Sequence, residues 1–228
     1  MGSIILMGGN EFRSECAAMD RAILARLPEQ PPRVVIVPTA AALQQPAVAA
    51  QNGIRYFDVL NAKATAAMII SRADANSREM ARQFERAGLV YLTGGSPWHL
   101  LQTLRDTRCW DAITEVLRRG GTIVGSSAGA MAMSDRMWWN NTWAMGLGMA
   151  QRVAVLPHHR VTGDLLPRAG LGRLGVLVVL GIAEATACVS EYGNVWNVAG
   201  QGKVAVYTDQ EIQVYGPGDS FTMPDVEA

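Results

Sequence analysis

Two adjacent serines, Ser126 and Ser127, stand in the segment GTIVGSSAGAMAM, between an apolar run and a series of small residues. Gly125, Ser127 and Gly129 fit the spacing G-x-S-x-G. Where this spacing joins a strand to a helix, the tight turn lifts the central serine hydroxyl out of the carboxyl end of the sheet. Such a hydroxyl can attack a carbonyl carbon, although a serine here can also simply cap the helix. The sequence leaves both interpretations open, and the strand–turn–helix context favours a nucleophile at Ser127.

A serine nucleophile needs an oxyanion donor and a base. The amide of Ala128 is expected at the start of the helix, where unpaired N–H groups and the helix dipole favour a developing oxyanion. The three histidines are His99, His158 and His159. The last two end the strand-like run RVAVLP, and residues at the ends of neighbouring strands meet at one edge of a sheet. We therefore expect one member of this pair to be the base, and His99 to have a surface or capping role.

The residue that orients the base has several candidates. The carboxylates after the serine that we consider are Asp135, Asp164, Glu184 and Glu191. Glu184, in LGIAEATACV, is a lone carboxylate among apolar and small residues, so it must face a pocket, find a partner or lie in solvent at a strand edge. The sequence favours Glu184 and leaves a solvent-exposed glutamate as the alternative.

Short β-branched runs alternate with helix-patterned stretches along the first part of the chain. The strands are expected at 3–9, 33–40, 89–95 and 122–127. The helices are expected at 12–27 and 76–88, with one or two more over 97–121. This alternation with continuous apolar strands predicts an α/β fold: a mostly parallel sheet with helices on both faces. The last third reads as short strands and turns, a short C-terminal β meander at the edge of the sheet. Since no linker or internal repeat interrupts the chain, we expect a single domain over 1–228.

The composition excludes several classes of protein. Hydrophobic residues make up 49% of the 228 residues and the formal net charge is zero, without a Lys/Arg-rich run, so neither nucleic acid nor a membrane is expected as a partner. Cys16, Cys109 and Cys188 are scattered, which does not indicate a disulfide framework. The chain has no CxxC or HExxH motif, and we expect no metal and no cofactor. Without a signal peptide or a membrane-length apolar run, a cytoplasmic protein is expected.

Four motifs in the chain, taken in order, resemble those of the peptidase E and cyanophycinase family of serine peptidases. They are YLTGGSPWHLLQTL, GTIVGSSAGAMAM, VLPHH and GIAEATACV. The resemblance covers nearly the whole length. It implies a fold similar to the class I glutamine amidotransferases, which is flavodoxin-like, with serine in place of the amidotransferase cysteine.

The resemblance also implies a set of catalytic roles. Ser127 matches the family's nucleophile, His158 its base and Glu184 the glutamate that orients the base. The amides of Gly95 and Ala128 would form the oxyanion hole. The implied activity is hydrolysis of a peptide or isopeptide amide bond in a small substrate through an acyl-enzyme, as in a dipeptidase, with aspartyl substrates among the candidates.

The chain departs from the family pattern at positions that bear on the substrate. Ser96 and Pro97 stand where the family usually has Asp or Asn followed by a polar residue, and His159 stands where phenylalanine is usual. Trp138, in the tryptophan-rich segment MWWNNTWAMGLGM, could line an apolar substrate pocket, form a homodimer contact or pack in the core. Ser96, His159 and Trp138 are therefore the candidate substrate-binding residues, and a homodimer is left open.

Three other functions are compatible with parts of the sequence. An esterase of the α/β-hydrolase class shares the serine turn but usually places its histidine late, after the acid, whereas no histidine follows His159 here. A non-catalytic binding or structural member of the same fold would tolerate the altered GGSP loop and the doubled histidine. A glutaminase-like amidotransferase would require cysteine at position 127. The serine peptidase is the favoured interpretation.

Overall fold

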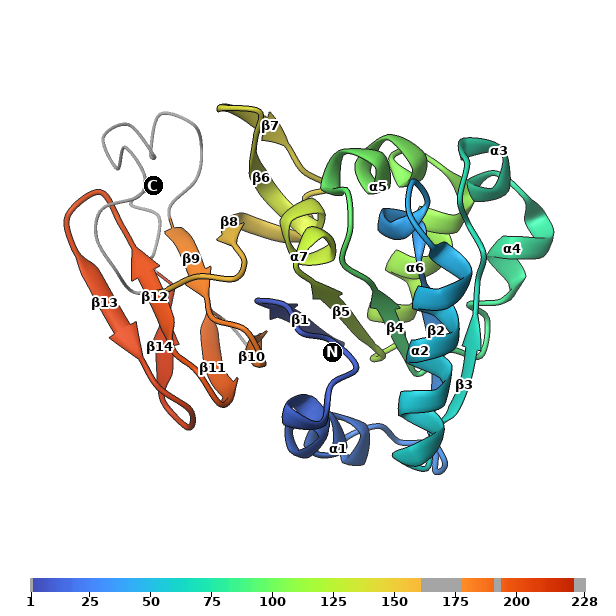
Figure 1. Cartoon of the computed structure of the whole chain (residues 1–228), viewed down its shortest axis with the longest axis horizontal. Helices are drawn as coiled ribbons and strands as arrows, with labels where there is room; N and C mark the ends of the chain where they lie inside the picture. Colours follow the sequence, from blue (N-terminus) through green and yellow to red (C-terminus); the bar gives the residue numbers. More distant parts are fainter. Residues whose placement is uncertain (1, 161–177, 191–193, 224–228) are drawn as a thin grey trace.

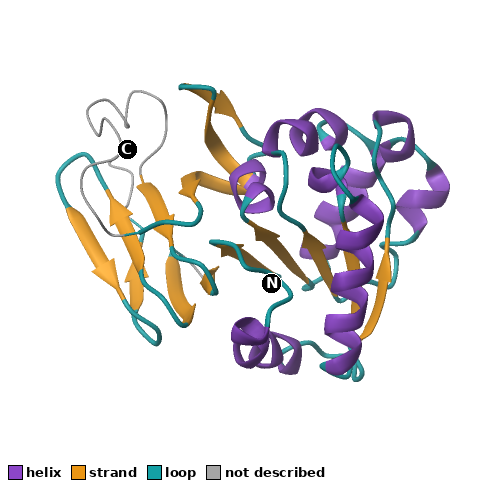
Figure 2. Ribbon diagram, in the orientation of Figure 1, coloured by secondary structure: helices purple, strands orange, loops and turns teal. Residues whose placement is uncertain are grey.

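Two β-sheets form the framework of the protein (Figure 1). The structure is a computed structural model of the chain, and it describes residues 2–160, 178–190 and 194–223. Within these residues the helices gather around the first sheet, while the second sheet extends away from them (Figure 2). This is an α/β architecture with mixed sheets.

The first sheet has eight strands in the order β14-β11-β10-β1-β5-β4-β2-β3. Five strands, from β1 to β3 in that order, run parallel, and the remaining three are antiparallel to their neighbours. The strands are β1 (Ser3–Met7), β2 (Arg33–Val37), β3 (Lys63–Ala66), β4 (Leu89–Leu92), β5 (Thr122–Ser126), β10 (Thr186–Ser190), β11 (Val195–Gly200) and β14 (Ser220–Thr222). The parallel strands bring the segments that follow β1, β4 and β5 to the same edge of the sheet.

Helices cover both faces of this sheet, as the alternating strand and helix patterns predict. They are η1 (Ser14–Cys16), α1 (Ala17–Ala25), η2 (Thr39–Ala41), α2 (Pro46–Val59), α3 (Arg72–Ala75), α4 (Arg78–Arg82), α5 (Pro97–Leu104), α6 (Arg108–Arg118) and α7 (Ala128–Met133). Alternate strand residues face opposite sides. Thus Ile5 of β1 lies in the core beneath α1 and α2, whereas Leu6 lies in the core beneath α5, α6 and α7.

The second sheet has six strands in the order β13-β12-β9-β8-β6-β7. They are β6 (Ser134–Trp139), β7 (Thr142–Met145), β8 (Ala150–Leu156), β9 (Val178–Ile182), β12 (Val204–Tyr207) and β13 (Ile212–Tyr215). β8 lies parallel between β6 and β9, and the outer strands are antiparallel. The last third of the chain therefore divides between the two sheets and is more extensive than the short meander that the sequence predicts.

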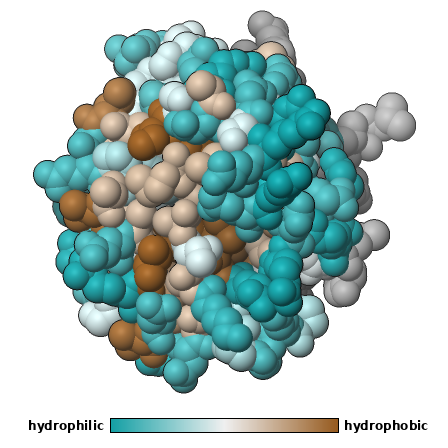
Figure 3. Space-filling model, turned by 90° about the vertical axis from the view of Figure 1, so that its right-hand side faces the viewer, coloured by the Kyte–Doolittle hydropathy of each residue, from teal (hydrophilic) through white to brown (hydrophobic). Residues whose placement is uncertain are grey.

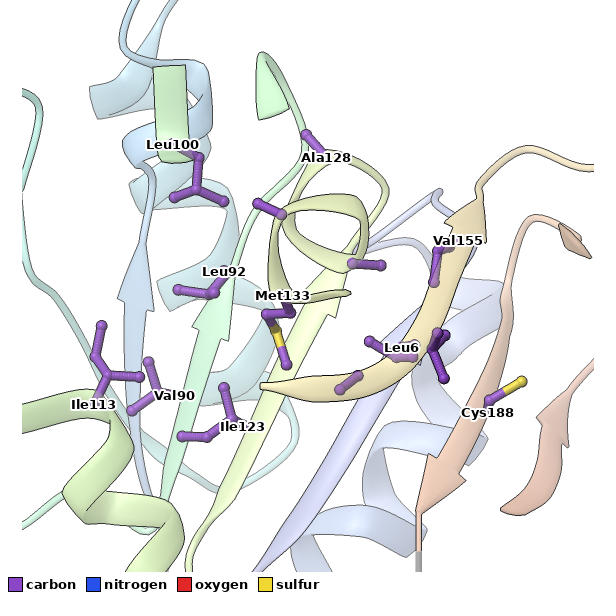
Figure 4. Close-up of a cluster of buried hydrophobic side chains, with 14 of the residues drawn as sticks. Leu6, Val90, Leu92, Leu100, Ile113, Ile123, Ala128, Met133, Val155 and Cys188 are labelled. Carbon is purple, nitrogen blue, oxygen red and sulfur yellow. The ribbon is translucent and has the colours of Figure 1, made fainter. Parts of the chain in front are cut away.

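The short helix α7 lies between the sheets and is almost wholly buried (Figure 4). Its Ala130 and Met133 are fully buried in the same cluster as Leu92 of β4 and Val155 of β8. Small residues allow the helix to approach the strands closely: a Cβ at Gly129 would lie only 2.4 Å from the Leu92 carbonyl oxygen. The core thus fixes the helix that directly follows Ser127.

The structure decides one helical prediction and shortens another. Of the one or two helices expected over 97–121, the segment forms two, α5 and α6, both of which begin with a capping hydroxyl. The helix expected over 76–88 is limited to α4, after which the amides of Gln83 and Glu85 bond to carbonyls three residues earlier. This tighter turn carries Phe84, which is fully buried, into the core. Burial of one large side chain therefore ends the helix earlier than its sequence pattern indicates.

On the helical side of the molecule, apolar residues lie mostly toward the left and centre of the view in Figure 3, with hydrophilic residues elsewhere. Among the described residues, the most exposed large apolar side chains are those of Val59 and Leu43, at 76% and 75%. Within the described residues, no helix is both long and apolar enough to cross a membrane.

Candidate active site

The turn between β5 and α7 holds Ser127 in an unusual backbone conformation. Its φ of 49° and ψ of −110° lie in a region that non-glycine residues rarely occupy, and its amide donates to the Met7 carbonyl at 2.9 Å. A Cβ at Gly125 would lie 2.6 Å from the Gly129 backbone, so both glycines permit the close contact between strand and helix. The Ser127 side chain forms no capping bond to α7. Its hydroxyl is instead directed to a histidine.

Ser127, His158 and Glu184 form a continuous chain of hydrogen bonds. Ser127 Oγ lies 2.9 Å from His158 Nε2, and His158 Nδ1 lies 2.9 Å from Glu184 Oε1. The tautomer protonated on Nδ1 satisfies both contacts, because Nδ1–H donates to the carboxylate while Nε2 accepts from the hydroxyl. The side chains of His158 and Glu184 are about half exposed, at 48% and 51%. This arrangement gives the hydroxyl a base and the base an orienting acid.

The segment after β1 fixes His158 from one side. The His158 amide donates to the Gly8 carbonyl at 2.7 Å, and the histidine itself has a φ of 52°. Gly9 leaves the space that the imidazole fills, because a Cβ there would lie 2.3 Å from His158 Cε1. The next residue, Asn10, donates from Nδ2 to Glu184 Oε2 at 2.9 Å. The carboxylate therefore has one oxygen on the histidine and the other on an amide.

Two backbone amides are the candidates for an oxyanion hole. Ala128 is the first residue of α7, so its amide has no carbonyl partner within the helix. Gly95 lines the same cleft as Ser127, with a φ of 137° that favours glycine, and a Cβ there would lie 2.2 Å from the Ala40 carbonyl oxygen. Gly95 thus lines the cleft into which Ser127 opens, and Ala128 directly follows Ser127. The family resemblance expects the amides of these two residues to form the oxyanion hole.

Ser127 and His158 open into a polar cleft of about 680 Å³. The other lining residues are Asn10, Glu11, Arg13, Ala41, Gln44, Gln45, Val48, Ala49, Asn52, Gly94 and Gly95. A neighbouring hollow of about 500 Å³ shares Glu11, Arg13, Ala49 and Asn52 with it and reaches Arg55 and Tyr56. The cleft and the hollow together therefore have amide side chains and two guanidinium groups, those of Arg13 and Arg55, at a polar surface. Among the described residues, no cluster of His, Cys, Asp or Glu is arranged to hold a metal ion.

The three candidate substrate-binding residues lie in different surroundings. The Ser96 hydroxyl accepts from the His99 amide at 3.2 Å and so caps α5. His159 is buried, with its Nε2 2.7 Å from the Tyr207 hydroxyl, and burial lowers its pKa from the usual value. Trp138, in β6, packs edge-on against Trp143 across the β6–β7 hairpin. None of the three is among the residues that line the cleft within the described chain.

One further histidine and three further acids were considered from the sequence. His99 Nε2 lies 2.9 Å from the Ile70 carbonyl oxygen, in keeping with a structural role. Asp135 lies in β6. Asp164 and Glu191, two alternative acids, lie outside the described residues.

Asn10 and Glu11 belong to the site, although the sequence analysis did not select them. Asn10 contacts Glu184, and Glu11 accepts from the Gly94 amide at 2.7 Å and from the Ser126 hydroxyl at 2.8 Å. A signal was present: polar residues directly follow the glycines that end a buried strand, and this end of a parallel sheet is where ligands bind.

The chain is similar to known peptidases in sequence and in fold. The model of peptidase family S51 matches residues 4–160. Cyanophycinases from Trichormus variabilis and Geminocystis herdmanii are 27% and 24% identical, over 92% and 95% of this chain and 74% and 84% of theirs. A crystal structure of a peptidase from an acI-B1 Actinobacterium superposes with a TM-score of 0.85 at 26% identity, covering 97% of both chains.

A more distant structure shows the same fold. A putative peptidase E protein from Listeria monocytogenes EGD-e superposes with a TM-score of 0.61 at 18% identity, over 95% of this chain and 98% of that one. The chain belongs to peptidase family S51. It is accordingly a serine peptidase, as the four ordered motifs predict.

Proposed function

We propose that the protein hydrolyses a peptide or isopeptide amide bond in a small substrate through an acyl-enzyme on Ser127. The observation that carries the proposal is the hydrogen-bonded chain from Ser127 through His158 to Glu184, with both contacts at 2.9 Å. The unusual φ and ψ of Ser127 support it further, because strained backbone is concentrated at functional sites.

The first half of the reaction forms the acyl-enzyme. Ser127 Oγ attacks the amide carbonyl carbon as His158 Nε2 takes the hydroxyl proton, and Glu184 stabilises the imidazolium that results. The carbonyl oxygen becomes an oxyanion that accepts from the amides of Gly95 and Ala128. The C–N bond then breaks as His158 gives its proton to the leaving amine. The ester between Ser127 and the acyl group remains.

The second half releases the product. A water molecule loses a proton to His158 and attacks the ester carbonyl, and the same two amides hold the new oxyanion. The C–O bond to Ser127 breaks as His158 returns the proton to the serine hydroxyl. The products are a carboxylic acid and an amine, and the site is restored.

The cleft favours a short, polar substrate. Its volume of about 680 Å³ suits a small ligand, and most of the side chains that line it are polar. Arg13 lines the cleft and Arg55 the adjoining hollow, so a substrate carboxylate has two guanidinium partners within this region. An aspartyl dipeptide, or an isopeptide of the kind implied by the name of the cyanophycinase relatives, meets these requirements.

Hydrolysis of a small peptide library tests the proposed function. The library contains dipeptides with and without an N-terminal aspartate and their isopeptide-linked counterparts, and liberated amine is measured. We expect turnover by the wild type and a loss of roughly 1000-fold or more in Ser127→Ala and His158→Ala, since removal of either residue disables nucleophilic attack. Turnover that persists in Ser127→Ala contradicts the proposal.

A further inference from the structure

The carboxylate of Glu11 connects three segments of the site that are far apart in the sequence. Its Oε1 accepts from the Gly94 amide at 2.7 Å and its Oε2 from the Ser126 hydroxyl at 2.8 Å. It therefore joins the segment after β1 to the glycine turn after β4 and to the last residue of β5. Both of its contacts lie next to residues of the proposed mechanism, because Gly94 precedes Gly95 and Ser126 precedes Ser127.

The segment that carries Glu11 is itself fixed on both sides. Asn10 before it bonds to Glu184, and both Asn10 and Phe12 have a positive φ, of 62° and 63°. The ring of Phe12 packs against three aromatic rings, those of Tyr56, Phe57 and Tyr91. A backbone held in this sparsely populated region persists only where surrounding contacts determine it. The carboxylate of Glu11 is thus presented from a firmly anchored turn.

These contacts determine which groups are left for the reaction. Because Glu11 accepts from the Gly94 amide, the following amide of Gly95 is the one that remains for an oxyanion. Because Glu11 accepts from the fully buried Ser126 hydroxyl, the hydroxyl of Ser127 is the one presented to His158.

We propose that Glu11 is a positioning residue that holds the glycine turn and the serine turn together, at the separation that the oxyanion hole requires. This inference rests on the proposed function of Ser127. It makes the hydrogen-bond acceptor of Glu11 essential and its charge dispensable, because both of its protein contacts come from neutral donors. A different role, direct binding of a substrate ammonium group, would make the charge essential.

The test measures the second-order rate of labelling by an uncharged fluorophosphonate probe. In this reaction Ser127 Oγ bonds to phosphorus, the P–F bond breaks, fluoride leaves and His158 takes the serine proton. The phosphoryl oxygen occupies the oxyanion hole, and the probe has no ammonium group. The rate therefore reports on the arrangement of the site without requiring knowledge of the natural substrate.

Four variants separate the hydrogen bonds from the charge. Glu11→Ala removes both contacts, and Ser126→Ala removes one of them. Glu11→Gln is the conservative variant, since its amide oxygen can accept from the Gly94 amide while its NH₂ group donates to the Ser126 hydroxyl. Glu15→Ala is the matched control, because Glu15 is an exposed glutamate on η1 whose carboxylate accepts locally, from the Ser14 hydroxyl and from its own backbone amide. Thermal melting verifies that each variant is folded.

We expect Glu11→Ala to lower the labelling rate by roughly 10- to 100-fold, because small displacements of reacting groups have effects of this size. Glu11→Gln should stay within about threefold of the wild type, Ser126→Ala should show a smaller loss than Glu11→Ala, and Glu15→Ala should show none.

Two results would overturn the inference: wild-type labelling by folded Glu11→Ala, or a loss in Glu11→Gln as large as that in Glu11→Ala. Failure of the proposed function is a separate result, since the wild type would then show no more labelling than Ser127→Ala.

Discussion

At the scale of single residues, the site depends on backbone conformations that side chains normally avoid. Ser127, His158 and Ala185, which follows Glu184, all have φ values near 50°. Each such residue costs on the order of 1 kcal/mol or more, so surrounding contacts must stabilise it. Part of that stabilisation comes from the segment after β1, where the carbonyls of Gly8 and Gly9 accept from the amides of His158 and Ala185. A small change in this segment should therefore affect the reaction more than the fold.

Gly9→Ala tests this dependence. The new Cβ would lie 2.3 Å from His158 Cε1, so the imidazole must move away from Ser127. We expect fluorophosphonate labelling to fall by roughly 100-fold or more. Gly120→Ala is the control, because Gly120 also has a positive φ, of 93°, but has no atom within 4 Å of the added Cβ. It should lose a little stability and label normally, and equal labelling of the two variants would contradict this role of Gly9.

The sequence predicted some site residues and missed others for a physical reason. Ser127 lies in a motif whose spacing reflects a local turn, and the resemblance pointed to His158 and Glu184. Asn10 and Glu11 act through contacts with residues more than eighty positions away. The spacing of residues within a short segment does not reveal such contacts. The roles of Asn10 and Glu11 could be inferred only from the structure, which shows which strand ends lie next to them.

At the scale of elements, the ends of β8 and β9 must stay together for His158 to meet Glu184. The residue after the base contributes to this. The His159 amide donates to the Ile182 carbonyl at 2.9 Å, and its ring, at 6% exposure, bonds to Tyr207 of β12. A Cβ at Gly181 would lie 2.5 Å from the His159 ring, so the strand has room for this side chain. The buried imidazole thus anchors the strand ends that carry the site.

The burial of His159 predicts a pH dependence of stability. Desolvation lowers its pKa in the folded state, so the unfolded chain binds a proton more readily as the pH falls below the usual value of about 6.5. His159 should therefore destabilise the fold increasingly between about pH 7 and pH 5. In His159→Phe this contribution is absent. Over that pH range, the free energy of unfolding of the variant should therefore fall by up to about 2 kcal/mol less than that of the wild type.

Urea unfolding of the wild type and His159→Phe at both pH values measures this difference. The informative quantity is the change in the free energy of unfolding between the two pH values, compared between the two proteins. The absolute free energies are less informative, because loss of the Tyr207 contact alters stability at every pH. Parallel curves would show that His159 does not titrate differently in the two states.

Element boundaries were predictable where local pattern decides them. The β-branched runs at 33–40 and 122–127 became β2 and β5. The shortening of α4 was not predictable, because it depends on where Phe84 finds space in the core.

At the scale of the whole molecule, the parallel sheet with helices on both faces confirms the predicted fold class. The second sheet was beyond prediction. In this sheet β8 pairs in parallel with both β6 and β9, so long-range contacts that no local pattern specifies determine the strand order. The strand order of the second sheet matters for function, because β8 leads to His158 and β9 leads to Glu184. The second sheet therefore brings His158 and Glu184, the proposed base and acid, to a serine that the first sheet presents.

Because each of the two sheets supplies part of the site, the reactivity of the site depends on how the sheets are arranged. If the two sheets hold their relative positions in solution, one serine among all those in the chain should be activated. The neighbouring hydroxyl of Ser126 is buried and bonded to Glu11, so it should remain unreactive.

Peptide mapping by mass spectrometry after fluorophosphonate treatment tests this claim most directly. We predict a single adduct per chain, located on Ser127, and none in His158→Ala over the same time. An adduct on Ser126 or another residue, or an unmodified wild type, would contradict the account.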